Sequence, residues 1–267
     1  MNLTKITIGQ YYNVNSKIHL LDPRLKFIST IVLLSTLFIA NNLISFVVIG
    51  VFVYVLILLS KVPVRFVFRG VRAISYIIFF TMVINVLFAP GSTVVFYFWV
   101  ITITQESLIW ALQMSVRLVM ILVISSILTL TTSPINLTSA IENLLSPLKK
   151  VRIPAHEIAM MMTIALRFIP TLLEETEKIM KAQSARGASF DTDGIIKRIK
   201  NLVPIIVPLF VSSFRRADDL AMAMEARCYR GDINRTKMKV LKYDKRDFIA
   251  FVVVVSLLVI VVILGQI

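Results

Sequence analysis

The sequence predicts an all-α, polytopic membrane protein with about five transmembrane spans and long cytoplasmic amphipathic helices. Hydrophobic residues make up 57% of the 267 residues, and only 16% are charged. Soluble domains are typically about 45–50% apolar and about 25% charged. Long uncharged runs also alternate with basic segments, and one of these, residues 133–246, holds 20 of the 29 Lys and Arg residues. Composition and charge pattern together therefore indicate an integral membrane protein.

The first uncharged run extends from Phe27 to Ser60, and we expect it to form two spans. As a single helix its 34 residues would reach about 51 Å, which exceeds a hydrocarbon core of about 30 Å. The pair Asn41-Asn42 is the natural turn between the two halves. No apolar segment typical of a cleaved signal peptide precedes Phe27.

The next segments alternate between basic and uncharged stretches. We expect a basic loop at residues 61–72, a span over residues 73–89 and another span over residues 107–130. Between these two spans, Pro90-Gly91-Ser92 breaks the run, and residues 93–104 are either re-entrant or lie at the outer surface. Arg117 is a charge inside a span, where it either pairs with a carbonyl or partner group or reaches the interface.

The last uncharged run, Phe248 to Ile267, reads as a final span. Basic residues concentrate in three blocks that lie on one side if the N-terminus is cytoplasmic, as the positive-inside rule favours. We therefore expect a multi-pass cell-membrane protein with three regions. These are an N-terminal transmembrane region with four spans (residues 1–132), a cytoplasmic region of long amphipathic helices (133–246) and a C-terminal span (247–267).

Two long amphipathic helices are expected within the cytoplasmic region, from Pro154 to Ala185 and from Gly194 to Ala226. Each has apolar residues at helical spacing in its first part and becomes charged toward its end. A helix that is too charged to span and too apolar to stand in water is expected to lie against the membrane or other apolar helices. Its polar end is then free to project.

Both helices close on the same short motif, Ala185-Arg186-Gly187 in the first and Ala226-Arg227-Cys228 in the second. Small residues let a helix tip enter a groove closely, and a guanidinium can pair there with carboxylates or carbonyls. One alternative is that each arginine only satisfies the last carbonyls and the dipole of its helix, with glycine after it as the usual C-cap. The repetition of the motif favours a docking function.

Other classes of function find no support in the motifs. His19 and His156 have no second histidine or carboxylate at ligand spacing, so we expect no metal site and no cofactor in this chain. No phosphate-binding P-loop, nucleophile elbow or zinc-protease motif occurs, which argues against an enzyme. The excess of Lys and Arg over Asp and Glu is explained by the positive-inside rule for membrane proteins, and we expect no nucleic-acid partner.

Nearly the whole chain resembles the transmembrane T component of energy-coupling factor (ECF) transporters, which import vitamins and transition-metal ions. The resemblance rests on the doubled motif, on residues 166–170 (Leu-Arg-Phe-Ile-Pro) and on residues 19–24 (His-Leu-Leu-Asp-Pro-Arg). It implies that Ala185, Arg186, Gly187 and Ala226, Arg227, Cys228 dock into grooves on two ABC-type ATPase subunits, which bind the ATP. It also implies that the apolar faces hold a membrane-embedded, substrate-binding S component. Cys228 departs from the glycine common in the family, so a left-handed cap is less assured there.

The expected function is therefore that of a non-catalytic energy-coupling scaffold for vitamin uptake. A T component dedicated to cobalt or nickel is the close alternative, because another chain selects the substrate. A stand-alone secondary carrier or channel would need polar residues that converge at the membrane midplane, and apart from Arg117, Asn85 and scattered Ser and Thr the spans offer few. An intramembrane enzyme would need paired catalytic groups, which the spans lack.

Overall fold

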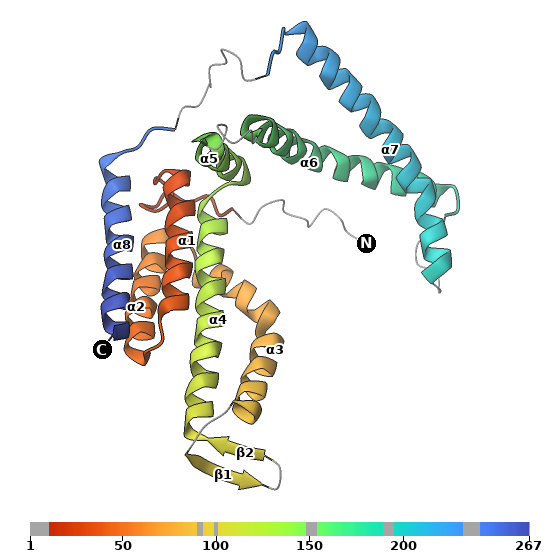
Figure 1. The fold of residues 1–267 in the computed structure, drawn as a ribbon. Coiled ribbons are helices and arrows are strands. Elements are labelled where there is room, and N and C mark those ends of the chain that lie inside the picture. Colours follow the sequence, from red (N-terminus) through yellow and green to blue (C-terminus); the bar gives the residue numbers. More distant parts are fainter. Residues whose placement is uncertain are drawn as a thin grey trace. The chain divides into compact units, whose positions relative to one another are not determined.

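The computed structural model describes residues 11–89, 93–98, 101–147, 154–188, 195–231 and 241–266 (Figure 1). The described chain forms helices α1 to α8 and one two-stranded sheet. It divides into two compact units. The bundle unit comprises Gly9–Ala140 and Val240–Ile267, and the paired-helix unit comprises Met1–Ile8 and Ile141–Lys239.

The first uncharged run folds back as predicted. It forms α1 (Pro23–Ile39) and α2 (Leu43–Ser60), with the turn at Ala40, Asn41 and Asn42. The side chain of Asn42 donates a hydrogen bond of 2.8 Å to the carbonyl of Leu264, near the end of the last helix. The polar pair inside the run thus provides both the turn and a contact between distant segments.

The basic segment after α2 is not a loop throughout, which corrects our expectation for residues 61–72. Helix α3 spans Val64–Phe88 and therefore contains the basic residues Arg65, Arg69 and Arg72. Their spacing of four and then three residues places them on one helical face. The prediction starts this span after Arg72, the last charged residue. The helix begins earlier, at Val64, because its first turns carry the arginines on one face.

A β-hairpin joins α3 to α4 at the segment whose path the sequence left open. Strand β1 (Val94–Phe98) pairs antiparallel with β2 (Ile101–Thr104), with Val94 opposite Thr104. Helix α4 (Gln105–Thr131) follows directly, and Thr104 caps it by accepting a hydrogen bond from the Ser107 amide at 3.2 Å.

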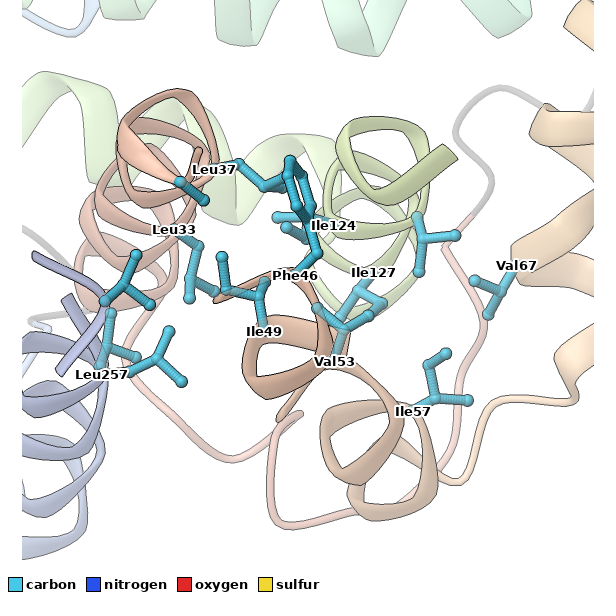
Figure 2. Close-up of a cluster of buried hydrophobic side chains, with 14 of the residues drawn as sticks. Leu33, Leu37, Phe46, Ile49, Val53, Ile57, Val67, Ile124, Ile127 and Leu257 are labelled. Atoms are coloured by element: carbon cyan, nitrogen blue, oxygen red, sulfur yellow. The ribbon is translucent and has the colours of Figure 1, made fainter. Parts of the chain in front are cut away.

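The last helix, α8 (Lys245–Gln266), packs against α1 and α2, and α4 packs against α1, α2 and α3. Leu37, Ile49 and Val261, from α1, α2 and α8, are completely buried where these helices meet. Figure 2 shows this core, in which Ile124 of α4 also takes part. The bundle unit is therefore a helical bundle around one apolar core.

The paired-helix unit contains the two predicted amphipathic helices, α6 (Ala155–Ala185) and α7 (Ile195–Ala226). Their bounds agree with the prediction to within one residue. Helix α5 (Pro134–Leu145) precedes them along the chain and begins at a proline, which is favoured at the first position of a helix.

By length and composition, 5 helices of the described chain could cross a membrane, namely α2, α3, α4, α6 and α8. The number agrees with the prediction, but the set differs. Helix α1 has 17 residues and rises only about 26 Å, less than a hydrocarbon core of about 30 Å. Helix α6, which we expected to be too charged to span, qualifies because its charged residues gather beyond its apolar first part.

Candidate partner-docking sites

The first motif copy terminates α6 through backbone hydrogen bonds. The helix ends at Ala185, after which Gly187 adopts a left-handed φ of +89°. The Gly187 amide donates to the Ser184 carbonyl at 3.0 Å, and the Ala188 amide donates to the Gln183 carbonyl at 3.0 Å. This pair of bonds is the Schellman C-cap, in which a left-handed residue closes the last turn.

The second copy closes α7 with the same geometry. Beyond Ala226, Cys228 has a left-handed φ of 54°. The Cys228 amide donates to the Glu225 carbonyl at 2.8 Å, and the Tyr229 amide donates to the Met224 carbonyl at 3.0 Å. Cysteine therefore occupies the position that glycine holds in the first copy. A residue with a side chain is destabilised in this conformation by roughly 1–2 kcal/mol. The second copy therefore keeps the backbone geometry of the first despite this cost at Cys228.

All six motif residues, Ala185 to Gly187 and Ala226 to Cys228, are exposed. Neither the Arg186 nor the Arg227 guanidinium makes a hydrogen bond or ion pair with another residue that the structure describes. No side-chain hydrogen bond to the terminal carbonyls therefore supports the capping alternative in this part of the chain, but its glycine cap is observed at Gly187 and its helix-dipole part needs no contact. Each tip instead presents five N–H donors beside small side chains.

Helices α6 and α7 cross in opposite directions within the paired-helix unit. Near the end of α6, the Gln183 side chain donates to the Pro204 carbonyl in the first half of α7 at 3.4 Å. Further back along α6, Glu175 accepts a hydrogen bond of 3.1 Å from Ser212 and pairs with Arg216, both later on α7. The two helices are therefore antiparallel: residues nearer the start of α6 contact residues nearer the end of α7.

A histidine at the start of α6 contacts the residue that follows the second motif copy. His156 is buried; one ring nitrogen lies 3.1 Å from Glu142 and the other 3.3 Å from the Tyr229 hydroxyl. The end of α7 thus meets the beginning of α6, so the Arg186 and Arg227 tips lie at opposite ends of the crossed pair. We had treated His156 as isolated, because its partners are 14 and 73 residues away.

Apolar side chains remain exposed along α7 and the first part of α6. A contiguous exposed apolar surface of this kind marks a lipid or protein contact. On α7 it includes Leu202, Val203, Ile206, Val207, Phe210, Val211 and Phe214, and on α6 Met161, Met162 and Ile169.

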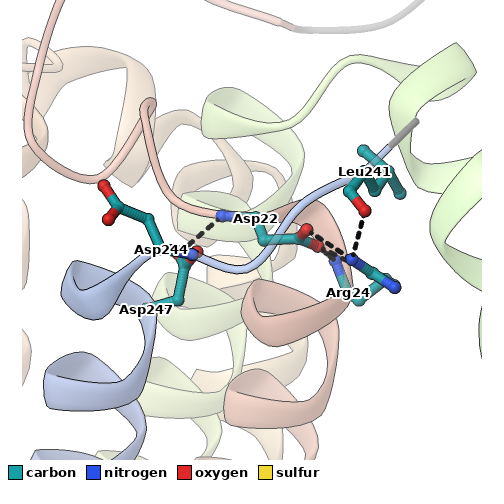
Figure 3. A network of polar contacts seen from close by, with 5 residues as sticks. All are labelled: Asp22, Arg24, Leu241, Asp244 and Asp247. Atoms are coloured by element: carbon teal, nitrogen blue, oxygen red, sulfur yellow. Dashed lines mark hydrogen bonds and ion pairs between the residues drawn. The ribbon is translucent and has the colours of Figure 1, made fainter. Parts of the chain in front are cut away.

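The segment before α1 connects that helix to α8 (Figure 3). Asp22 caps α1 by accepting from the Arg24 amide at 2.8 Å and pairs with the Arg24 guanidinium at 2.9 Å. Arg24 also donates to the Leu241 carbonyl at 3.0 Å. The buried Asp247 carboxylate accepts from the Asp22 amide at 2.9 Å and from the Asp244 amide at 2.8 Å. These contacts give residues 19–24 a structural role, as the cap of α1 and its attachment to α8.

His19 belongs to the same segment. Its Nε2 donates to the Tyr12 carbonyl at 2.9 Å, because a carbonyl can only accept, and its Nδ1 lies 2.7 Å from the Ser16 hydroxyl, which can donate to it when the ring is neutral. Burial, followed by the positive charge of Lys26, lowers the pKa of His19 below its ordinary value, against an opposing contribution from the Tyr12 carbonyl.

Arg117 has a partner inside the bundle. Its Nη2 donates to the Ala40 carbonyl at 2.7 Å, and its guanidinium lies over the Phe46 ring at 5.4 Å. Of the two interpretations of this residue, the structure supports pairing with a carbonyl, at the turn between α1 and α2.

No group of three or more His, Cys, Asp or Glu side chains that could hold a metal ion occurs among the residues that the structure describes. Cys228 is a free, exposed thiol.

Residues 14–239 match the CbiQ family, whose description is "Cobalt transport protein". Curated relatives named "Energy-coupling factor transporter transmembrane protein EcfT" align over nearly their full length. One from Acidaminococcus fermentans is 51% identical over 257 residues, covering 96% of each chain. One from Clostridium kluyveri is 52% identical over 92% of this chain and 91% of the relative. One from Lactococcus lactis subsp. cremoris is 41% identical over 99% of this chain and 100% of the relative.

Proposed function

Since the chain belongs to the CbiQ family and, within it, to the transmembrane proteins of energy-coupling factor transporters, we propose that it couples two ABC-type ATPase subunits to a membrane-embedded substrate-binding S component. It is the scaffold of the complex and carries no catalytic residue of its own. The ATPases bind and hydrolyse ATP. The N-terminus lies on the cytoplasmic side, where both helix tips reach the ATPases.

The observation that carries this proposal is the repeated Schellman cap at the two tips. Two copies of one motif have the same backbone geometry, expose Arg186 and Arg227, and lie at opposite ends of a crossed helix pair. Two equivalent tips, held apart, fit two equivalent grooves on two subunits better than one shared groove. The small neighbours Ala185, Gly187 and Ala226, with Cys228, allow each tip to enter closely.

In this mechanism the ATPases move the tips and the crossed helices carry that movement to the partner. The ion pair between Glu175 and Arg216 joins the helices where they cross. The exposed apolar surface of α6 and α7 is the proposed contact for the S component and the lipid bilayer.

The test is co-purification of the chain with its ATPase subunits, for the wild type, Arg186→Ala, Arg227→Ala and the double variant. Truncating one partner of a desolvated charge pair costs about 2–5 kcal/mol, which is a loss of affinity of about 30-fold or more. We expect each single variant to weaken ATPase binding or ATP-driven uptake, and the double variant to abolish it.

Lys181→Ala and Arg215→Ala are the matched controls, because both are exposed basic residues on the same two helices. They should leave assembly unchanged. If the double variant assembles and supports uptake like the wild type, the arginines do not dock and the mechanism is wrong.

The substrate class has two candidates. The names of the relatives specify no substrate, which suits a scaffold shared among several vitamin-binding S components, whereas the family description names cobalt. Uptake of labelled vitamins and of labelled Co²⁺, measured in cells that express this chain with each type of S component, separates them. Vitamin uptake through two or more different S components supports the shared scaffold, and uptake of Co²⁺ alone supports the dedicated one.

A further inference from the structure

A cavity of about 670 Å³ lies inside the bundle unit, between α1, α2, α4 and α8. This volume falls within the range of about 300–1,000 Å³ that is typical of small-molecule sites. Its walls are almost entirely aliphatic and aromatic, as with Leu33 of α1 and Ile124 of α4 (both labelled in Figure 2). Nothing in the energy-coupling role uses this space.

The cavity has one polar end and one apolar end. On α1 its lining runs from Leu25 to Leu33, and on α8 from Arg246 to Val254. Eight residues of helix rise about 12 Å, which approaches half of a hydrocarbon core of about 30 Å. The cavity therefore extends through about one leaflet.

Three basic side chains, Lys17, Lys26 and Arg246, line the polar end. Lys26 is buried, and its ammonium donates to the carbonyls of His19 and Thr131, each at 3.1 Å. An ammonium has three donors, so one remains. Lys26 makes no contact ion pair with any residue that the structure describes, although Asp247 and Asp22 attract its charge from a greater distance.

A second observation at the same end points to a ligand. Ser29 lines the cavity, and its hydroxyl oxygen is buried and has no hydrogen-bond partner in the described structure. It lies three residues after Lys26 and therefore one turn deeper on the same face of α1. A buried hydroxyl without a partner costs about 1–3 kcal/mol, which an acceptor in the cavity would relieve once the Ser29 side chain rotates toward it.

The carboxylates near this end are already engaged and do not line the cavity. Asp22 pairs with Arg24, and Asp247 accepts two backbone amides. Asp244 lies 3.8 Å from the Arg246 guanidinium, but both side chains are exposed, and such surface pairs are weak. Backbone amides do not neutralise Asp247, so four cations (Lys17, Lys26, Arg246 and Arg24) stand against the three carboxylates of Asp22, Asp244 and Asp247. The polar end keeps a net charge of four minus three, or one positive unit, and every charged side chain that lines the cavity there is basic, which favours an anion.

The lining also reaches the outer surface of the bundle unit. Val55 and Leu59 of α2 and Ile249 and Val253 of α8 line the cavity and are exposed. An apolar chain can enter from the bilayer between these two helices.

We propose that the cavity binds one anionic phospholipid. Its phosphate lies against the ammonium groups of Lys17 and Lys26 and the guanidinium of Arg246, an ester carbonyl accepts the Ser29 hydroxyl, and one acyl chain fills the apolar part toward Leu33. The lipid places an anion in direct contact with the Lys26 ammonium, supplies an acceptor for Ser29 and holds α1 and α8 together.

The experiment is native mass spectrometry of the full chain in detergent micelles, titrated with phosphatidylglycerol, phosphatidylcholine or glycerol 3-phosphate. We expect one phosphatidylglycerol per chain to bind more tightly than phosphatidylcholine, and glycerol 3-phosphate to bind far more weakly because it lacks acyl chains. The double variant Lys17→Ser/Arg246→Ser removes two exposed cations. It should weaken phosphatidylglycerol binding about 25-fold, at about fivefold for each basic side chain, and leave phosphatidylcholine unchanged.

The matched control is Lys61→Asn/Lys242→Ser, which removes the same charge from two exposed positions outside the cavity. Ser29→Leu, which fills the cavity and keeps the basic residues, should reduce binding of both lipids. Equal binding of the two lipids, an equal loss in the control, or tight binding of glycerol 3-phosphate would each overturn the proposal. So would a chain that binds no lipid, as expected if a protein partner occupies the cavity.

Discussion

Asp247 is the position at which one side chain joins the first and last helices of the bundle unit. Its carboxylate is 3% exposed and accepts the amides of Asp22 and Asp244 at 2.9 and 2.8 Å (Figure 3). Hydrogen bonds to a charged group contribute about 1.5–3 kcal/mol each. We therefore expect Asp247→Ala to lower the free energy of unfolding by about 3–6 kcal/mol, because it leaves two amides without an acceptor.

Asp247→Asn is the discriminating variant, since its amide keeps one acceptor oxygen and replaces the other with a donor. We expect Asp247→Asn to lower the free energy of unfolding by about half as much as Asp247→Ala does. In thermal unfolding of the purified chain in micelles, about 2–4 °C per kcal/mol gives a decrease on the order of 10 °C for Asp247→Ala. The exposed Asp218→Asn on α7 is the control and should leave the midpoint unchanged.

Two results would refute this reasoning. If Asp247→Ala unfolds within about 1 °C of the wild type, the two hydrogen bonds contribute little to stability. If Asp247→Asn is as damaging as Asp247→Ala, the charge and not the count of acceptors is what matters, and the assignment of the loss to two separate hydrogen bonds is wrong.

Two further predictions concern titration and the helix caps. Because burial lowers the pKa of His19 below its ordinary value of 6.5, the unfolded chain binds a proton that the folded chain resists. Unfolding midpoints measured from pH 7.5 to 5 should thus fall as the pH drops below about 6.5, and His19→Gln should flatten that slope; an unchanged slope would exclude His19 as its source. Gly187→Ala should loosen the last turn of α6 by about 1 kcal/mol, because a Cβ is strained at its φ of +89°. Cys228→Gly should tighten the last turn of α7 by about 0.5–1 kcal/mol. Amide hydrogen exchange measures both changes, and effects of the opposite sign would contradict the cap assignment.

The sequence predicts the helices well where polarity changes sharply along the chain. Asn41-Asn42 marks the turn between α1 and α2, and the end of each apolar pattern marks α6 and α7. The prediction is wrong at α3, because the arginines at residues 65, 69 and 72 belong to the helix and not to a loop. Their helical spacing, and Pro63 just before Val64, are the signals that would have placed the start correctly.

Long-range polar contacts could not be predicted from the sequence. Glu142 and Tyr229 meet His156 across 14 and 73 residues, and Asp247 meets Asp22 across 225. Spacing along one chain carries no information on such pairs, since they depend on how the helices pack. One clue was available for Asp247, which is a lone carboxylate directly before the last uncharged run.

The motif copies, by contrast, were recognisable from the sequence alone, but their geometry was not. The repeated Ala-Arg pair indicated two equivalent tips. That Cys228 would adopt the left-handed conformation of Gly187 was in doubt, since a side chain disfavours it. The docking role of these residues stays a prediction for the variants described above.

In each motif the main chain and the arginine side chain serve different purposes: backbone hydrogen bonds end the helix, and the side chain stays exposed. Main-chain amides make the hydrogen bonds that end each helix, and no residue that the structure describes accepts a hydrogen bond from the Arg186 or Arg227 side chain. If the tips dock as proposed, substitutions at these two arginines change the surface that a tip recognises while the helix cap stays intact. Partner choice could then diverge between relatives, or be redesigned, without a compensating change in the helix.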